Sequence, residues 1–333
     1  MKFNGKLWIS IIFSLFFVVL VLYKIDFKKT SEALETADYL YLPLAVLLTI
    51  VTNIIRTYRW RFIINPIKHI STLSLFSGVA IGYMANNLLP ARLGEFIRAY
   101  IMGKKEDISK SSTLATILVE RIFDGLALLF FLVIIALLFS LPLWIKQAGV
   151  AAAAFFILLS AFLILLMIKK TTGIRLAKKI INIFSPRFAN KVGELLENFL
   201  SGLVIVNHKR NIFWAFIFSI FVWLSEASTY YIIGLSFGID LPVYVALLTV
   251  VIVNIGILIP SAPGYVGAFE FFTISALSIF AVEKSIALSY AIVLHAVLFI
   301  PITIIGVYYF WKENLHLSDI TNVSKIPSTS IES

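Results

Sequence analysis

Three charged residues follow an apolar run in the stretch NNLLPARLGEFIRAY, residues 86–100. They are Arg92, Glu95 and Arg98; helix-breaking Pro90 lies just before them and Gly94 lies among them. An arginine guanidinium stays charged at any working pH and binds phosphate through paired hydrogen bonds. Residues three apart lie on adjoining turns of a helix, so we expect Glu95 to orient Arg98 while Arg92 reaches the same cavity. The pattern predicts a binding site for a phosphate-bearing group.

A second charged group lies inside the apolar stretch LVERIFDGLALL, residues 118–129. At helical spacing Glu120 and Asp124 share a face, and Arg121 can pair with Asp124. An uncompensated charge costs several kcal/mol at the centre of a bilayer, so we expect these side chains to face partners or water. The full candidate set for binding a lipid headgroup is Arg92, Glu95, Arg98, Glu120, Arg121, Asp124, Glu226 and Glu270. The alternative interpretation is a structural ion-pair network that holds helices together.

The elements that must position these residues are predicted to be membrane helices. Of the 333 residues 60% are hydrophobic and only 14% are charged, and the apolar residues form successive runs of the length that crosses a bilayer. The sequence therefore predicts an all-α polytopic membrane protein, with residues 1–333 as a single integral membrane domain. The six predicted spanning helices are 7–25, 39–57, 114–138, 148–168, 212–235 and 286–310.

Two further apolar regions, 72–90 and 243–281, are interrupted by Pro and Gly and are predicted to be broken re-entrant segments. Each follows two spanning helices and precedes one, which divides the chain into a first repeat, 7–138, and a second repeat, 148–310. The predicted hinges are Pro90, Gly94, Pro260, Pro263, Gly264 and Gly267. Inverted repeats with broken helices at matching positions indicate a transport site near the midplane. The alternative is that both breaks are tight loops at the membrane surface.

Loop charges predict the orientation. The loop 24–38 mixes lysines with acidic residues, whereas Arg56, Arg59, Arg61 and Lys68 lie at and after the end of the second span without acidic neighbours. Such unopposed cations mark a cytoplasmic loop, which places the N-terminus in the cytoplasm of a multi-pass cell (cytoplasmic) membrane protein. Segment 169–210, with nine Lys or Arg against two Glu, is predicted to form cytoplasmic interfacial helices. The tail 312–333 carries little charge information.

Several classes of chemistry have no support in the sequence. There is no cysteine, and the four histidines are scattered, with His295 alone in an apolar helix where we expect it to be a packed hydrogen-bonding residue. No P-loop, Gly-rich dinucleotide turn or Ser-His-Asp arrangement occurs, so neither catalytic residues, a metal site, a cofactor nor ATP hydrolysis is expected. The net charge of +10 lies mainly in loops beside membrane segments, which favours contact with anionic lipid and not with nucleic acid.

Three stretches in order, LLPARLGEFIRAY, LVERIFDGLALL and IPSAPGYVGAFE, resemble the hallmark sequences of the lysylphosphatidylglycerol synthase transmembrane family, also called flippase-like membrane proteins. The resemblance covers nearly the whole chain. It implies a membrane domain that, in full-length lysylphosphatidylglycerol synthases, is associated with moving aminoacylated phospholipid between leaflets. Full-length synthases also carry a large soluble domain that transfers lysine from its tRNA, and the longest polar segment here, of about 40 residues, is too short for such a domain.

The predicted function is binding and translocation of an anionic phospholipid or lipid-linked intermediate. Two alternatives stay open: a phosphatidylglycerol lysyltransferase, which is the enzyme the family name suggests, and a membrane scaffold for a separate lipid-modifying or glycosyltransferase enzyme. The expected partner is thus an anionic membrane lipid, with such an enzyme as a further candidate.

Overall fold

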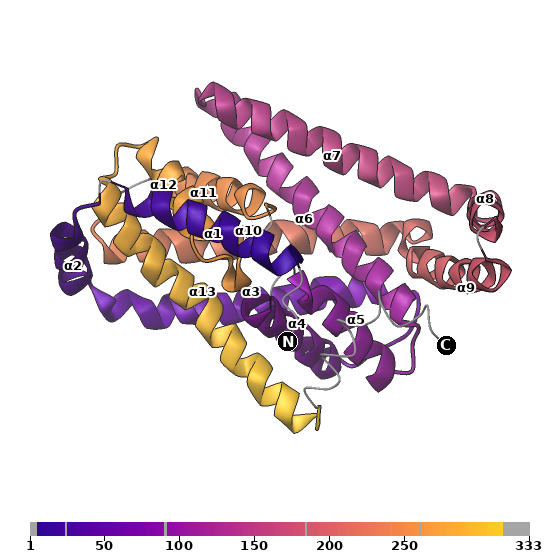
Figure 1. The fold of residues 1–333 in the computed structure, drawn as a ribbon. Helices are drawn as coiled ribbons and strands as arrows, with labels where there is room; N and C mark the ends of the chain where they lie inside the picture. Colours follow the sequence, from indigo (N-terminus) through magenta and orange to yellow (C-terminus); the bar gives the residue numbers. More distant parts are fainter. Residues whose placement is uncertain are drawn as a thin grey trace.

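The computed structural model describes residues 5–23, 25–89, 92–183, 185–240, 242–259 and 261–315, with the backbone alone for residues 5–10 and 187. Every regular element within these ranges is helical, as predicted (Figure 1). In chain order the helices are α1 Gly5–Leu22, α2 Phe27–Thr36, α3 Leu42–Ile64, α4 Thr72–Leu88, α5 Gly94–Lys105, α6 Lys110–Leu138, α7 Leu143–Ile168, α8 Lys170–Asn182, α9 Pro186–Gly202, α10 Lys209–Ser236, α11 Val243–Gly256, α12 Ala268–Ser278 and α13 Lys284–Lys312.

Five of these helices are long and apolar enough to cross a membrane, namely α3 with the turn before it, α6, α7, α10 and α13. They coincide with five of the six predicted spans. The remaining predicted span corresponds to α1, an 18-residue helix in which Ile11–Leu22 forms a shorter apolar stretch. The chain is therefore a multi-pass membrane protein.

Both predicted broken segments are helical hairpins whose two arms pack together. In the first hairpin, α4 and α5, Ser74 near the start donates a hydrogen bond of 2.5 Å to Glu106, just after the end. In the second hairpin, α11 and α12, the rings of Tyr244 and Phe280 bring start and end together at 6.1 Å. The first hairpin is longer than the predicted segment 72–90, because the chain turns back into a second helical arm that ends at Lys105.

The two hairpins enter the helix bundle from opposite ends. At one end of the bundle, called here the α2 end, the Asp38 amide donates a hydrogen bond of 2.8 Å to the Ser236 carbonyl, and Lys29 pairs with Glu283 at 2.8 Å. The second hairpin follows α10 and precedes α13, so both its arms reach this end. At the opposite end, called here the α9 end, Ser112 and Ser201 of α9 form a hydrogen bond of 2.7 Å. Ser112 comes soon after the first hairpin in the sequence, so that hairpin enters from the α9 end.

Helix α3 runs further than the sequence indicated, and this corrects the argument from loop charges. The predicted span 39–57 continues to Ile64, so Arg56, Arg59 and Arg61 lie within the helix and not in a loop. Arg59 is fully buried. Arg56 and Arg59 pair with carboxylates inside the bundle and say nothing about which side of the membrane a loop occupies. Arg61, in the last turn of α3, and Lys68 remain as indicators of orientation.

Helices α3 and α10 pack along their lengths at the centre of the bundle, where Phe62 and Phe218 contact at 5.4 Å between ring centroids. Helix α7 lies apart at the edge, with α8 and α9 beyond it (Figure 1). Only 6% of the apolar window of α7 is buried, against 28% to 44% for the other four candidate spans. Helix α7 therefore exposes most of its side chains to the surroundings, which for an apolar membrane helix are lipid.

Candidate functional site

The breaks of the two hairpins meet inside the bundle. The guanidinium of Arg92, in the first break, donates a hydrogen bond of 2.8 Å to the carbonyl of Ile257, in the second. The same guanidinium lies over the ring of Tyr265, 5.4 Å from its centroid. A Cβ at Gly264 would lie 3.3 Å from the carbonyl oxygen of Asn87. Backbone at membrane depth that leaves the helix is tolerated where protein or a water-filled cavity covers it, and here each break covers the other.

Positive φ angles shape both breaks. Arg92 has a φ of 53° and Tyr265 a φ of 60°, and the predicted hinges Gly264 and Gly267 have φ values of 67° and 87°. Glycine adopts this conformation at no steric cost, whereas Arg92 and Tyr265 pay about 1 to 3 kcal/mol each for it. The predicted hinge Pro263 begins the short turn between Pro263 and Tyr265. Pro90 and Pro260 lie outside the described residues.

Gly94 is required by the close approach of α4 and α5. A Cβ on Gly94 would lie 2.0 Å from the carbonyl oxygen of Gly82 and 2.6 Å from Oδ1 of Asn86. The amide of Gly94 donates a hydrogen bond of 2.9 Å to that Asn86 oxygen. Asn86 thus satisfies one of the free amides at the start of α5, which holds the two arms of the hairpin together at the break.

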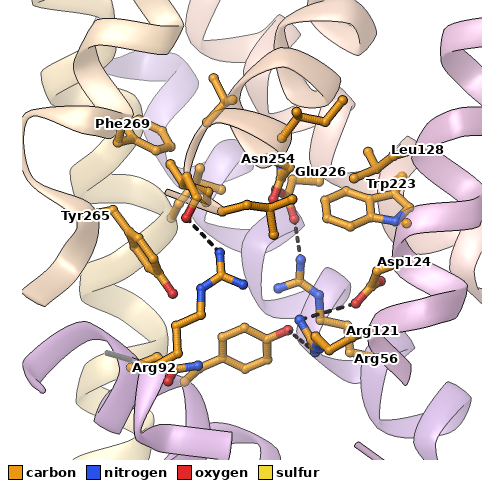
Figure 2. Close-up of a pocket in the computed structure, with 18 of the residues that line it drawn as sticks. Arg56, Arg92, Arg121, Asp124, Leu128, Trp223, Glu226, Asn254, Tyr265 and Phe269 are labelled. Carbon is orange, nitrogen blue, oxygen red and sulfur yellow. Dashed lines mark hydrogen bonds and ion pairs between the residues drawn. The ribbon is translucent and has the colours of Figure 1, made fainter. Parts of the chain in front are cut away.

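A cavity of about 300 Å³ lies beside the meeting point of the breaks. Figure 2 shows Arg92 and Tyr265 on one side of it, and Arg56, Arg121 and Asp124 on the other. Its polar lining residues include Asn53, Arg56, Tyr83, Asn86, Asn87, Arg92, Glu95, Arg121, Asp124, Trp223, Glu226, Tyr230, Asn254 and Tyr265. Its remaining walls are mostly apolar and come from α6, α7, α11 and α13. The cavity therefore joins a charged region to an apolar one.

Behind the cavity wall, Glu120 is the centre of a buried ion-pair network. Arg98 holds its carboxylate with two hydrogen bonds of 3.0 and 3.2 Å, and Arg59 approaches it to 3.1 Å. Arg121 contacts it from the cavity side. Arg98 also stacks on Trp60, with its guanidinium carbon 3.6 Å from the ring centroid. Such paired charges tolerate burial because each has a charged partner and hydrogen bonds.

Asp124 continues the network toward the cavity. It accepts hydrogen bonds from Arg59 and pairs with Arg121 at 3.3 Å, as the three-residue spacing predicted. Arg121 also approaches Glu95 at 3.7 Å. The expected pair of Glu95 with Arg98 is absent from the described residues, because Arg98 points toward Glu120 and leaves Glu95 to Arg121.

Glu226 is held by residues of two other helices. Arg56 of α3 pairs with it at 2.5 Å, and Asn254 of α11 donates a weak hydrogen bond at 3.5 Å. The Arg56 guanidinium lies between two aromatic faces, 4.9 Å from the centroid of Tyr83 and 5.7 Å from that of Trp223. These contacts fix the direction in which Arg56 presents its charge to the cavity (Figure 2).

The charges of this site do not cancel. Its five arginines and four carboxylates are Arg56, Arg59, Arg92, Arg98, Arg121, Glu95, Glu120, Asp124 and Glu226. Every carboxylate has an arginine within ion-pair distance. Arg92 is the arginine left without a carboxylate in the described part of the chain, and its contacts are a carbonyl and an aromatic ring. The excess positive charge therefore lies at the cavity wall, where Arg92 is partly exposed.

Of the eight predicted headgroup residues, five line the cavity, namely Arg92, Glu95, Arg121, Asp124 and Glu226. Arg98 and Glu120 lie behind its wall. Glu270 lies elsewhere: it accepts a hydrogen bond of 2.6 Å from the Gly267 amide at the start of α12 and contacts His295 at 2.5 Å. The expectation that His295 is a packed hydrogen-bonding residue is thereby confirmed.

Sequence reasoning missed Arg56 and Arg59 as members of the site, because their neighbouring cations suggested a loop. Their spacing was an available signal: three residues apart, and flanked by apolar residues on both sides, they fit one face of a continuing helix. Asn254 and Tyr83 gave no such signal, because single polar residues are common in membrane helices.

The fold and the cavity define a polytopic α-helical membrane protein in which two hairpins meet at a charged cavity. The chain belongs to the family described as Lysylphosphatidylglycerol synthase TM region, whose sequence profile matches residues 7–306. A UPF0104 membrane protein of Methanothermobacter thermautotrophicus is 25% identical over 294 residues, covering 84% of this chain and 87% of that protein. Glycosyltransferase AglD of Haloferax volcanii is 26% identical over 304 residues, covering 82% of this chain but 49% of AglD.

Proposed function

We propose that this protein binds an anionic lipid, either a phospholipid or a lipid-linked intermediate, through a phosphate in the cavity, and moves it between the two leaflets of the cell membrane. The observation that carries the proposal is Arg92: a cation with no carboxylate partner in the described residues, held at a cavity wall by Ile257 and Tyr265. Phosphate is one of the two anions, with carboxylate, whose geometry such a guanidinium matches with paired hydrogen bonds.

The two hairpins support movement as well as binding. They enter from opposite ends of the bundle and meet at the cavity, which is the arrangement expected when inverted repeats place a site near the midplane. A site at that depth is accessible from either side after a small rearrangement of one half against the other. The inverted relation of residues 7–138 and 148–310 is part of this proposal, as is a cytoplasmic N-terminus.

The charge of the cavity favours an anionic headgroup over an aminoacylated one. Lysyl-phosphatidylglycerol brings two ammonium groups to one phosphate, and therefore needs free carboxylates in its site. Glu95, Asp124 and Glu226 line the cavity, but each already has an arginine within 3.7 Å. A cationic headgroup would have to displace an arginine from a carboxylate, whereas a simple phosphate only has to meet Arg92.

The test is a lipid translocation assay with the purified chain in phosphatidylcholine liposomes. Trace lipids carry a fluorophore on one acyl chain, and dithionite bleaches those in the outer leaflet. We expect faster exchange of phosphatidylglycerol than of phosphatidylcholine or lysyl-phosphatidylglycerol. Arg92→Gln should slow this exchange at least ten-fold, while Arg210→Gln, at an exposed arginine outside the cavity, should leave it unchanged. Equal rates for all three lipids, or no effect of Arg92→Gln, would contradict the proposal.

A second candidate role is a membrane scaffold for a glycosyl-transferring enzyme. The match to AglD, a protein named a glycosyltransferase, covers 49% of its length, so in that relative the matched region is part of a longer protein. In this role the lipid in the cavity would be presented to an enzyme and not released in the other leaflet. Stable binding of phosphatidylglycerol by the purified protein without any exchange in liposomes would favour the scaffold over the translocator.

A further inference from the structure

One wall of the cavity is apolar and is built by α6 and α7. Helix α6 contributes Leu118, Leu128 and Leu129, and α7 contributes Ala152, Phe155, Phe156 and Leu159. Helix α6 also contributes Arg121 and Asp124 to the lining. Arg121 lies seven residues before Leu128, which is about 10 Å along the helix axis. Within two helical turns the lining thus passes from charged to apolar, which is the polarity profile of a lipid.

The cavity opens beside α7. Among its lining residues two are exposed, Phe155 at 57% and Leu258 at 47%. Phe155 therefore faces the cavity and the outside at once. Helix α7 lies at the edge of the bundle and packs mainly on α6, and its other side chains are largely exposed and apolar. An opening on this side leads into the hydrocarbon of the bilayer and not into water.

The contact that separates the opening from the charged region is small. Phe156 packs its ring against Gly125, where a Cβ would lie 2.2 Å from the ring, and Phe156 is only 9% exposed. Gly125 follows Asp124 directly, so the ring covers the α6 surface next to the ion-pair network.

We propose that the cavity has a lateral entrance, a gap between α6 and α7 beside the exposed Phe155, and that the hydrocarbon chain of the bound lipid lies in it, against Phe155 and Phe156, while the phosphate reaches Arg92. This inference rests on the proposed function, because it assigns the tail of the lipid whose headgroup that function places in the cavity. It commits to a chain of acyl or isoprenoid type, since both are apolar and flexible enough to leave the bundle through such a gap.

Photo-crosslinking tests the entrance with a matched pair of positions. Phe155 and Phe162 lie on the same helix seven residues apart, so they share a face, and they are 57% and 56% exposed. Phe155 lines the cavity and Phe162 does not. Each is replaced singly by p-benzoylphenylalanine, and the purified variants are placed in phosphatidylcholine liposomes that contain phosphatidylglycerol or phosphatidylcholine with an alkyne-tagged acyl chain.

We expect the variant at Phe155 to crosslink tagged phosphatidylglycerol at least three-fold more than tagged phosphatidylcholine. The variant at Phe162 should crosslink both lipids equally, because it meets only bulk lipid. Adding Arg92→Gln should abolish the preference at Phe155 and change nothing at Phe162. Each variant must first show a melting temperature close to that of the unmodified protein, which establishes that it is folded.

Equal crosslinking of the two lipids at Phe155, or a preference that survives Arg92→Gln, overturns the lateral entrance. If exchange of phosphatidylglycerol continues in that case, the proposed function stands and the lipid enters elsewhere, with Leu258 marking the other exposed side of the cavity. If the unmodified protein shows no exchange and the variant at Phe155 shows no preference, the proposed function fails together with the entrance.

Discussion

Arg92 and Tyr265 join the two broken segments across a sequence separation of more than half the chain. Each adopts a left-handed backbone conformation, with φ values of 53° and 60°, and the Arg92 guanidinium lies 5.4 Å from the centre of the Tyr265 ring. Conformations of this kind persist only where the surroundings hold them, and they gather at ligand sites and at segments that move. The contact therefore marks the joint at which the two hairpins act on each other.

The first prediction is that Arg92 and Tyr265 are energetically coupled. Tyr265→Leu removes the ring but keeps a non-glycine residue, and Tyr265→Phe keeps the ring. A double-mutant cycle of Arg92→Gln with Tyr265→Leu, measured by unfolding of the detergent-solubilised protein, should give a coupling of about 1 kcal/mol. The cycle with Tyr265→Phe should give almost none. Additive effects in the Tyr265→Leu cycle would show that the two hairpins meet without mutual stabilisation.

The second prediction separates two arginines that are six residues apart. Arg98 is 3% exposed and bonded to Glu120, so Arg98→Gln should destabilise the protein by about 3 kcal/mol or more and lower its melting temperature. Arg92→Gln removes a partly exposed side chain and should change the melting temperature little. It should instead weaken phosphatidylglycerol binding ten- to a hundred-fold, which corresponds to about 1.5 to 3 kcal/mol for a charge-assisted contact. Native mass spectrometry with added phosphatidylglycerol measures the binding.

A reversed result would reverse the assignment. If Arg98→Gln yields a stable protein that no longer binds the lipid, and Arg92→Gln yields an unstable one, then Arg98 is the ligand and Arg92 the structural residue. Arg210→Gln serves as the control for loss of an arginine at an exposed position.

Most of the helical architecture follows from the sequence, because runs of apolar residues of spanning length have few other structures available to them. The positions of the breaks also follow, since Gly94, Pro263, Gly264 and Gly267 interrupt such runs. The partners of individual charges do not. Helical spacing relates Glu95 to Arg98 within one helix, but Glu120 lies on another helix, and the packing of α5 against α6 decides which carboxylate Arg98 meets.

The ends of helices that contain charged residues are also difficult to predict from the sequence. A run of arginines after an apolar segment has two interpretations, a loop or a helix face that is buried against acidic partners. Arg59 belongs to the second kind because Glu120 and Asp124 of α6 neutralise it. Nothing in residues 39–64 reveals those partners, since they lie on a helix that begins more than forty residues later.

The third prediction concerns the close approach of α4 and α5. Gly94→Ala places a Cβ 2.0 Å from the Gly82 carbonyl oxygen, so the two arms must separate. We expect a loss of about 1 to 3 kcal/mol of stability and slower lipid exchange, because the break that carries Arg92 shifts with α5. The control is Gly173→Ala in α8, where the new Cβ would lie at an ordinary 3.4 Å from Leu166. That change should raise stability slightly, since alanine favours a helix.

The fourth prediction concerns orientation. Asp38 contacts Ser236, so α2 and Asp240 lie at one end of the bundle, while α8 and α9 lie toward the other (Figure 1). We expect the end with α8 and α9 to be cytoplasmic, because the lysines and arginines of segment 169–210 concentrate there. Single cysteines at exposed Asp240 and Lys179 of this cysteine-free chain test it by labelling with a membrane-impermeant maleimide. Labelling of Asp240→Cys only after the cells are opened would invert the predicted orientation.

The last prediction concerns Glu120, whose side chain is 1% exposed and which meets Arg59, Arg98 and Arg121. Glu120→Gln leaves Arg59 and Arg121 with Asp124, but it leaves Arg98 with no carboxylate in the described residues. A buried arginine without a counter-charge costs about 3 to 5 kcal/mol, so this variant should express poorly and melt at a much lower temperature. Glu95→Gln should be mild by comparison, because Glu95 is 25% exposed and its one ion-pair partner among the described residues is Arg121, at 3.7 Å.

A second substitution tests whether the unpaired charge of Arg98 causes the loss of stability. Arg98→Met, added to Glu120→Gln, removes that charge and keeps an apolar side chain that can lie on Trp60, so it should recover much of the lost stability, because an apolar residue in place of a buried ion is often neutral or stabilising. If Arg98→Met lowers the melting temperature of Glu120→Gln still further, then the stacking of Arg98 on Trp60 holds α5 in place. In that case Glu120 contributes through Arg59 of α3 and Arg121 of α6, the other two arginines that it contacts.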